Sequence, residues 1–134
     1  MNRIADILRG AHTIAVVGLS GKRYRPSYGV AEYLKRAGYR IIPVNPMETE
    51  ILGEKCYPDL ESVPEAVDIV DVFRRSEYVP DIVEAAIRKG AKVVWMQEGI
   101  VNEAAAQKAS QAGLEVVMDT CMRNTHRRLF SERA

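Results

Sequence analysis

Residues 13–38 read TIAVVGLSGKRYRPSYGVAEYLKRAG, and this segment is the strongest indication of the fold class. The apolar, β-branched run at residues 14–17 predicts a strand buried on both faces, which ends at Gly18. A basic loop follows, and then a helix is expected over about residues 27–37, with Gly38 as its C-terminal stop. A strand, a glycine turn and a helix in this order form the first unit of an α/β domain in which the loop N–H groups and the helix N-terminus face a phosphate.

The rest of the chain repeats the alternation of strand and helix. Four further strands are expected at residues 39–44, 68–73, 91–96 and 114–118. Helices are expected at residues 2–9, from a Ser76 cap to 88–89, from an Asn102 cap to 112, and from Asn124 or Thr125 onward. Residues 47–66 predict an irregular excursion, with a small hairpin about Gly53 and a helical turn capped by Ser62. Five strands alternating with helices predict a doubly wound, parallel five-stranded sheet in three layers.

Composition narrows the class of protein. With 134 residues, the chain is expected to form a single domain over residues 1–134. Nineteen basic against 18 acidic side chains argue against a bulk nucleic-acid binder. Asp6 and Arg9 interrupt the first apolar stretch, which excludes a signal peptide, and no apolar run reaches the ~18 residues that cross a bilayer. Cys56 and Cys121 lack a CxxC spacing, so a reduced, cytoplasmic chain is expected.

In such a sheet, ligands bind beyond the carboxyl ends of the strands, near the switch in strand order. Five turns lie there: residues 18–27, 45–46, 73–76, 97–99 and 119–121. The first contains Lys22, Arg23 and Arg25 and no acidic residue, and Arg74 and Arg75 follow the third strand directly. These clusters are either solvated loop charges or, as the position between strand and helix favours, a site for a ligand with several phosphates.

The glycines do not form the strict dinucleotide fingerprint, because no G-x-G-x-x-G pattern starts at Gly18. An NAD-binding unit carries Asp or Glu at the end of its second strand to hold the ribose hydroxyls. Asn45 stands at the corresponding place, between Val44 and Pro46. NAD is therefore disfavoured, and NADP requires that the loop arginines bind its 2′-phosphate.

Five segments, taken together, carry a resemblance to a known family. They are residues 15–20 (AVVGLS), 28–29 (YG), 43–46 (PVNP), 72–74 (VFR) and 95–99 (WMQEG), in order at the predicted strand ends. The chain resembles the CoA-binding protein family, which are small Rossmann-like proteins. They are similar to the CoA-binding domain of the succinyl-CoA synthetase alpha subunit and of related acyl-CoA synthetases. The resemblance covers residues 12–129.

The resemblance implies that coenzyme A is the cofactor, and it assigns the site residue by residue. The phosphate-binding turn would contain Gly18, Leu19 and Ser20, with Lys22, Arg23 and Arg25 facing the diphosphate or the 3′-phosphate and Tyr28 at the helix start. Val44, Asn45 and Pro46 would flank the nucleotide end, and Phe73 and Arg74 would line the same cleft. Gln97, Glu98 and Gly99 would approach the pantetheine arm.

The resemblance also limits the activity. The synthetases transfer phosphate through a histidine in a further domain, and neither His12 nor His126 matches it. The sequence contains no nucleophile–base–orienter set and no metal-ligand cluster such as H-E-x-x-H, which favours a binding protein over an enzyme. The expected function is therefore binding of CoA or an acyl-CoA by a non-catalytic cytoplasmic protein. The alternatives are a small NADP-dependent oxidoreductase and a non-catalytic synthetase subunit, and partners would be synthetase chains or further copies of this chain.

Two side chains and the terminal helix have two interpretations each. Cys121 follows the fifth strand and is either an inert, partly buried thiol or a partner of the CoA thiol in a mixed disulfide. Asp71 lies within a strand and is expected to pair across the fold rather than act with Asp68 as a catalytic carboxylate pair. The terminal helix, with Arg123, Arg127 and Arg128, either is solvated or contacts a ligand phosphate or a partner.

Overall fold

A computed structural model describes residues 3–130. Its main sheet is parallel and five-stranded, in the order β2-β1-β5-β6-β7, as the alternating pattern predicts. The strands are β1 (Thr13–Val17), β2 (Arg40–Val44), β5 (Ile69–Val72), β6 (Val93–Met96) and β7 (Glu115–Val117). A two-stranded hairpin, β3 (Glu50–Ile51) and β4 (Glu54–Lys55), forms the expected turn about Gly53.

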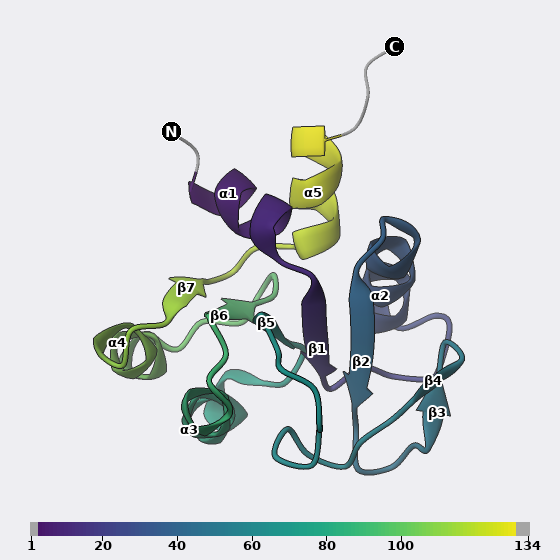
Figure 1. Ribbon diagram of the computed structural model, residues 1–134, viewed down its shortest axis with the longest axis horizontal. Helices are drawn as coiled ribbons and strands as arrows, with labels where there is room; N and C mark the ends of the chain where they lie inside the picture. Colours follow the sequence, from purple (N-terminus) through teal and green to yellow (C-terminus); the bar gives the residue numbers. More distant parts are fainter. Residues whose placement is uncertain (1–2, 131–134) are drawn as a thin grey trace.

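Helices cover both faces of the sheet and give three layers (Figure 1). One face carries α1 (Arg3–Gly10), α2 (Pro26–Arg36) and α5 (Met122–Phe130). The other face carries α3 (Val79–Lys89) and α4 (Glu103–Gln111). The central strands are apolar on both sides for this reason: in β1, Ile14 and Val16 pack under α2, whereas Ala15 and Val17 pack under α3 and α4. Within residues 3–130, no helix combines the length and the apolar character needed to cross a bilayer.

The strand order switches between β1 and β5, and this switch determines where a ligand site is expected. The chain leaves β1 for α2 on one face, and it leaves the neighbouring β5 for α3 on the other. The two connections therefore diverge at the carboxyl edge of the sheet, and this divergence opens the crevice in which doubly wound sheets bind ligands.

Most predicted helix ends are confirmed. The Asn102 side chain caps α4 by accepting the N–H of Ala105 (2.9 Å), and Pro80 lies in the first turn of α3. At the end of α2, the N–H of Tyr39 reaches the carbonyl of Leu34 (3.1 Å) around Gly38, the bond of a Schellman motif.

Three local predictions were wrong. Ser62 caps no helical turn, because its N–H and Oγ both donate to Asp59, which organises an isolated turn. Ser76 does not cap α3. It begins a short 3₁₀ turn (Ser76–Tyr78), and its Oγ accepts the N–H of Val101 instead (3.3 Å). The last helix starts at Met122, before Asn124 and Thr125, since the N–H of Thr125 already bonds the carbonyl of Cys121 (3.0 Å).

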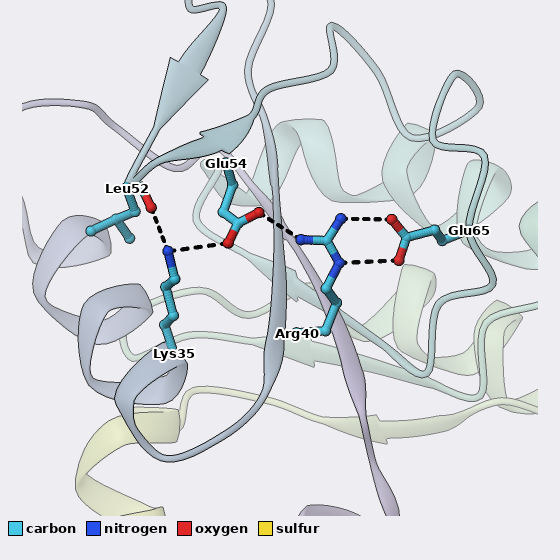
Figure 2. A network of polar contacts seen from close by, with 5 residues as sticks. All are labelled: Lys35, Arg40, Leu52, Glu54 and Glu65. Carbon is cyan, nitrogen blue, oxygen red and sulfur yellow. Dashed lines mark hydrogen bonds and ion pairs between the residues drawn. The ribbon is translucent and has the colours of Figure 1, made fainter.

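An ion-pair network fixes the β3–β4 hairpin to the edge of the sheet (Figure 2). Arg40, the first residue of β2, binds Glu65 through two nitrogens (3.1 and 2.6 Å) and Glu54 of the hairpin through a third (2.6 Å). Lys35 of α2 reaches Glu54 (3.1 Å) and the carbonyl of Leu52 (2.6 Å). The hydrogen bonds from Arg40 hold the pKa of Glu65 below its usual value. Arg40 thus joins two segments of the excursion between β2 and β5.

We expect Arg40→Gln to lower the free energy of unfolding by about 1–2 kcal/mol, because it removes a bidentate charged pair whose side chains remain partly solvated. Arg36→Gln is the matched control. Arg36 pairs with Glu32 one helical turn away and is 80% exposed, so its loss is expected to cost about 0.5 kcal/mol or less. Urea unfolding of both variants measures the difference, and equal costs would contradict a structural role for the network.

Candidate functional site

Gly18 ends β1 at the point where two backbones touch. Its φ is +91°, and a Cβ placed on it would lie 2.7 Å from the carbonyl oxygen of Phe73, at the end of β5. The Gly18 N–H donates to the carbonyl of Val44 in β2 (2.9 Å), and the Phe73 N–H donates to the carbonyl of Val17 (2.8 Å). Glycine is required here by both the conformation and the close approach.

We expect Gly18→Ala to lower the free energy of unfolding by about 2–3 kcal/mol, through left-handed strain and a clash with rigid backbone. Gly10→Ala is the control, because a Cβ at Gly10 meets nothing within 4 Å, and a change within about 0.5 kcal/mol is expected there. Chemical denaturation distinguishes the two variants. Two equally stable variants would refute the close approach.

The loop from Gly18 to α2 carries the predicted phosphate-binding groups. The Ser20 N–H donates to the Oγ of Ser27 (3.0 Å), and the Ser20 Oγ accepts the N–H of Lys22 (3.0 Å), so the loop is tied to the start of α2. No side chain caps that helix, and its first turn has no acidic residue. The positive end of its macrodipole is therefore not neutralised by the helix itself.

Four cations of this edge lie outside the ion pairs formed among the described residues. Within residues 3–130, ion pairs join Arg3–Glu115, Arg9–Asp6, Lys35–Glu54, Arg36–Glu32, Arg40–Glu54, Arg40–Glu65, Arg88–Glu61, Lys92–Asp68 and Lys108–Glu84. No such pair in that range includes Lys22, Arg23, Arg25 or Arg74. Arg25 lies over the ring of Tyr24 (5.8 Å) and Arg74 over that of Tyr78 (4.3 Å). These guanidinium groups remain available to an anionic ligand.

One carboxylate does approach this loop, and sequence reasoning missed it. The Glu48 side chain lies against Gly21, with an oxygen 3.1 Å from where a Cβ would stand. It follows β2 by four residues, just beyond the turn in which a ribose-binding acid was sought. The side chain of Asn45, which follows β2, makes hydrogen bonds within the protein. Its amide nitrogen donates to the carbonyl of Leu19 (2.9 Å), and its amide oxygen accepts the N–H of Met47 (2.8 Å).

A cleft of about 310 Å³ opens on the α3 side of the same edge. Four predicted residues line it: Gly18, Val44, Pro46 and Arg74. Its other walls come from the excursion before β5 and from α3, namely Pro58, Asp59, Leu60, Glu61, Asp81, Ile82, Ala85 and Arg88, together with Val17. Residues 58–61 show no periodic pattern that indicates a position at this edge, so these walls were not predicted. The volume lies at the lower end of the range for small-molecule sites.

The remaining predicted residues have distinct environments. Lys22, Arg23, Arg25, Glu98 and Gly99 are exposed, Ser20, Tyr28, Asn45 and Phe73 are half-buried, and Leu19 and Gln97 are buried. Leu19 therefore offers the site its backbone, while its side chain packs in the core under α2. The structure brings the residues after β1, β2 and β5 together, and Glu98 and Gly99 stand further along the same edge, after β6.

Comparison with known proteins agrees with this architecture. A family model described as a CoA binding domain matches residues 12–127. The chain belongs to the CoA binding domain family. It is 44% identical over 123 residues to YneT of Bacillus subtilis, covering 92% of this chain and 91% of that protein. A solved structure of a protein from Pyrococcus horikoshii superposes with a TM-score of 0.92 at 44% identity, covering 94% of this chain and 89% of the other.

The chain is also similar to part of a larger enzyme. It is 33% identical over 82 residues to acetate–CoA ligase (ADP-forming) II of Archaeoglobus fulgidus, which is 60% of this chain and 12% of the ligase. The CoA binding domain thus corresponds to a small part of that protein.

Beneath the edge of this CoA binding domain, a carboxyl group is buried without a charged partner. Asp71 of β5 is fully buried, and its Oδ1 accepts a hydrogen bond from Gln97 Nε2 (2.6 Å). Among the described residues its Oδ2 has no partner. Gln97 Oε1 in turn faces the N–H of Met122, at the start of α5 (3.4 Å). The Gln97 side chain therefore lies in the interior and joins β5 to α5, and its approach to the pantetheine arm, which the resemblance implies, stays a prediction.

Burial raises the pKa of Asp71 to about 7, partly offset by the Gln97 hydrogen bond. A raised pKa means that the folded state holds a proton that the unfolded chain releases near pH 4. The resulting stability is fully present below pH 4 and is lost as the pH rises to about 7.

We therefore expect Asp71→Asn to gain stability relative to the native protein as the pH rises from 4 to 7, by up to about 4 kcal/mol. The amide keeps the acceptor for Gln97 and carries no ionisable proton. Urea unfolding at a series of pH values measures the difference, and a constant difference across this window would contradict a protonated Asp71.

The histidines and cysteines lie outside the cleft. The backbone N–H of His12 donates to Asp68 at the amino end of β1 (2.8 Å), far from the carboxyl edge. His126 bonds the Tyr33 hydroxyl between α5 and α2 (2.8 Å), and burial lowers its pKa. Cys56 is buried and Cys121 is half-buried, and neither forms a disulfide.

A larger hollow, of about 620 Å³, lies at the opposite, amino-terminal edge of the sheet. The ion pairs Arg3–Glu115 and Lys92–Asp68 belong to its walls. The C-terminal ends of α3 and α4, at Gly90 and Gly113, also face it. Because helix C-termini are negative, this hollow is unsuited to a phosphate-bearing ligand despite its size.

Proposed function

We propose that this protein binds coenzyme A, or an acyl-CoA, as a small non-catalytic cytosolic protein. The observation that carries the proposal is the group of unpaired cations at the switch of strand order, in a member of the CoA binding domain family. The ligand phosphates would lie at the loop after Gly18 and the N-terminus of α2, near Lys22, Arg23 and Arg25.

We expect the adenine ring of the ligand to bind in the cleft on the α3 side. Val17, Val44, Pro46, Leu60 and Ile82 give it apolar walls, which suit a flat aromatic base. Gly18 and Arg74 stand where this cleft meets the edge of the sheet, since the Arg74 side chain reaches to 3.0 Å from a Cβ on Gly18. A nucleotide with its base in the cleft would thus carry its phosphates past Arg74. The pantetheine arm would run toward Glu98 and Gly99.

The direct test is calorimetric and thermal-shift titration with CoA, dephospho-CoA, NADP and NAD. CoA is expected to bind, to stabilise the protein by ~2.7 kcal/mol at a 100-fold excess over its Kd, and to bind more tightly than dephospho-CoA. Arg74→Gln is expected to weaken CoA binding by about 1.5–3 kcal/mol, because a charged hydrogen bond is lost. Arg36→Gln, at the far end of α2, is the charge-matched control and should leave the affinity unchanged.

Glu48 distinguishes a phosphorylated ribose, as in CoA or NADP, from the free ribose of NAD. A carboxylate beside the loop would bind the free ribose hydroxyls of NAD and repel a phosphorylated ribose. Glu48→Gln should therefore leave CoA binding equal or stronger. A protein that ignored CoA but bound NADP or NAD would contradict the proposal and support the oxidoreductase alternative.

A second candidate, a non-catalytic subunit of an acyl-CoA synthetase, rests on the similarity to the acetate–CoA ligase. It shares the CoA-binding step. It differs in requiring chains that supply the remaining domains, so acetyl-CoA formation from acetate, CoA and ATP would appear only after those chains are added.

A further inference from the structure

Arg123 reaches from α5 to the first turn of α2. One terminal nitrogen of its guanidinium lies 3.0 Å from where a Cβ on Gly29 would stand. Gly29 is the fourth residue of α2, which begins at Pro26. The absence of a side chain at this position therefore makes room for the guanidinium beside the N-terminal turn.

Contacts one turn further along show how the two helices run. Tyr33 of α2 bonds His126 of α5 (2.8 Å), and Arg127 lies over the Tyr33 ring (5.4 Å). From Gly29 to Tyr33 along α2, the contacted residue of α5 changes from Arg123 to His126. The two helices therefore run parallel to each other. Their N-termini both lie at the carboxyl edge of the sheet, and Arg123 lies between them.

This is an unfavourable place for an isolated cation. The N-terminal turn of α2 is itself positive and contains no acidic residue, and Arg25 precedes it directly. Within residues 3–130, Arg123 has no carboxylate partner, and its buried Nε has no hydrogen-bond acceptor. A buried donor without an acceptor destabilises the fold, and such costs concentrate where a group serves a ligand. The charges around Arg123 therefore favour an anion at this point.

We propose that Arg123 is a phosphate-binding residue of the CoA site, placed over the α2 N-terminus by the missing side chain of Gly29. The inference rests on the proposed function and adds to it a cation from the other end of the chain. One phosphate of the ligand is held jointly by the positive N-terminal end of α2 and the fork of Arg123. The terminal helix is then part of the site, where the sequence left open whether it is solvated.

The experiment measures CoA, inorganic pyrophosphate and pantetheine binding by calorimetry to the full chain and its variants. Arg123→Gln is expected to weaken the binding of CoA and of pyrophosphate about 10- to 100-fold, because a charged hydrogen bond is lost. The affinity for pantetheine should stay unchanged. Arg123→Lys should retain part of the affinity, because it keeps the charge and loses the fork. Arg128→Gln removes an exposed charge from the same helix and should change CoA binding less than twofold.

Gly29→Ala tests the placement without altering Arg123. The added methyl displaces the end of a flexible side chain and improves helix propensity, so the melting temperature should not fall while the CoA affinity does. In the Arg123→Gln background, Gly29→Ala should have no further effect on CoA, because the two changes act through one group.

The outcomes separate the two proposals. If Arg123→Gln and Gly29→Ala bind CoA like the native protein, the role of Arg123 is overturned and CoA binding stands. If the native protein ignores CoA but binds pyrophosphate in an Arg123-dependent way, the phosphate role stands and the proposed function falls. If it binds neither, both are overturned.

Discussion

The contact between the ends of β1 and β5 is the constraint on which the site depends. At Gly18 the backbone turns with a positive φ and passes so close to the Phe73 carbonyl that no Cβ fits. The hydrogen bonds from Gly18 to β2 and from Phe73 to β1 fix three strand ends at one point. From there the chain diverges to α2 on one face and to α3 on the other, so the cationic loop and the cleft begin a few residues apart. Moving these backbones apart would separate the two halves of the site.

The protein is nearly neutral, yet the carboxyl edge of its sheet is positive because four cations there form no ion pair with a carboxylate among residues 3–130. Many cations of the helices and of the sheet edge meet carboxylates, as Arg40 of β2 does with Glu54 and Glu65. Those at the loop after β1 and at the end of β5 do not, within the part of the chain that the structure describes. Exposed unpaired cations cost little stability, since surface ion pairs contribute little. The uneven pairing therefore generates attraction for an anion at one edge, with almost no net charge on the protein as a whole.

Much of this arrangement is predictable because it is local. The β-branched runs, the glycine stops and the Asn102 cap follow from neighbouring residues, and they determine the sheet and the turns at its carboxyl edge. The positions of side chains whose partners are distant in sequence cannot be predicted in this way. Ser76 stands where a helix cap is expected, yet its Oγ accepts a hydrogen bond from the distant Val101 N–H. The Gln97 side chain lies in the interior because it donates to the buried Asp71, 26 residues earlier in the chain. The cleft walls at residues 58–61 and the position of Glu48 depend on an excursion with no periodic pattern, so no local signal indicates them.

The division of the edge by Gly18 and Arg74 restricts the kind of ligand that fits. On the α3 side the cleft has apolar walls bordered by charged side chains, and on the α2 side lie a positive helix N-terminus and cations. A ligand that uses both must join a flat apolar group to phosphates, which describes a nucleotide but not any single one. In the proposed function, the choice among nucleotides would fall to the turn after β2. There Asn45 is occupied with the backbone of Leu19 and Met47, and Glu48 stands against the loop at Gly21. In the proposed function, recognition of the phosphates would thus follow from the strand order, whereas discrimination between a free and a phosphorylated ribose would depend on the four residues that follow a single strand.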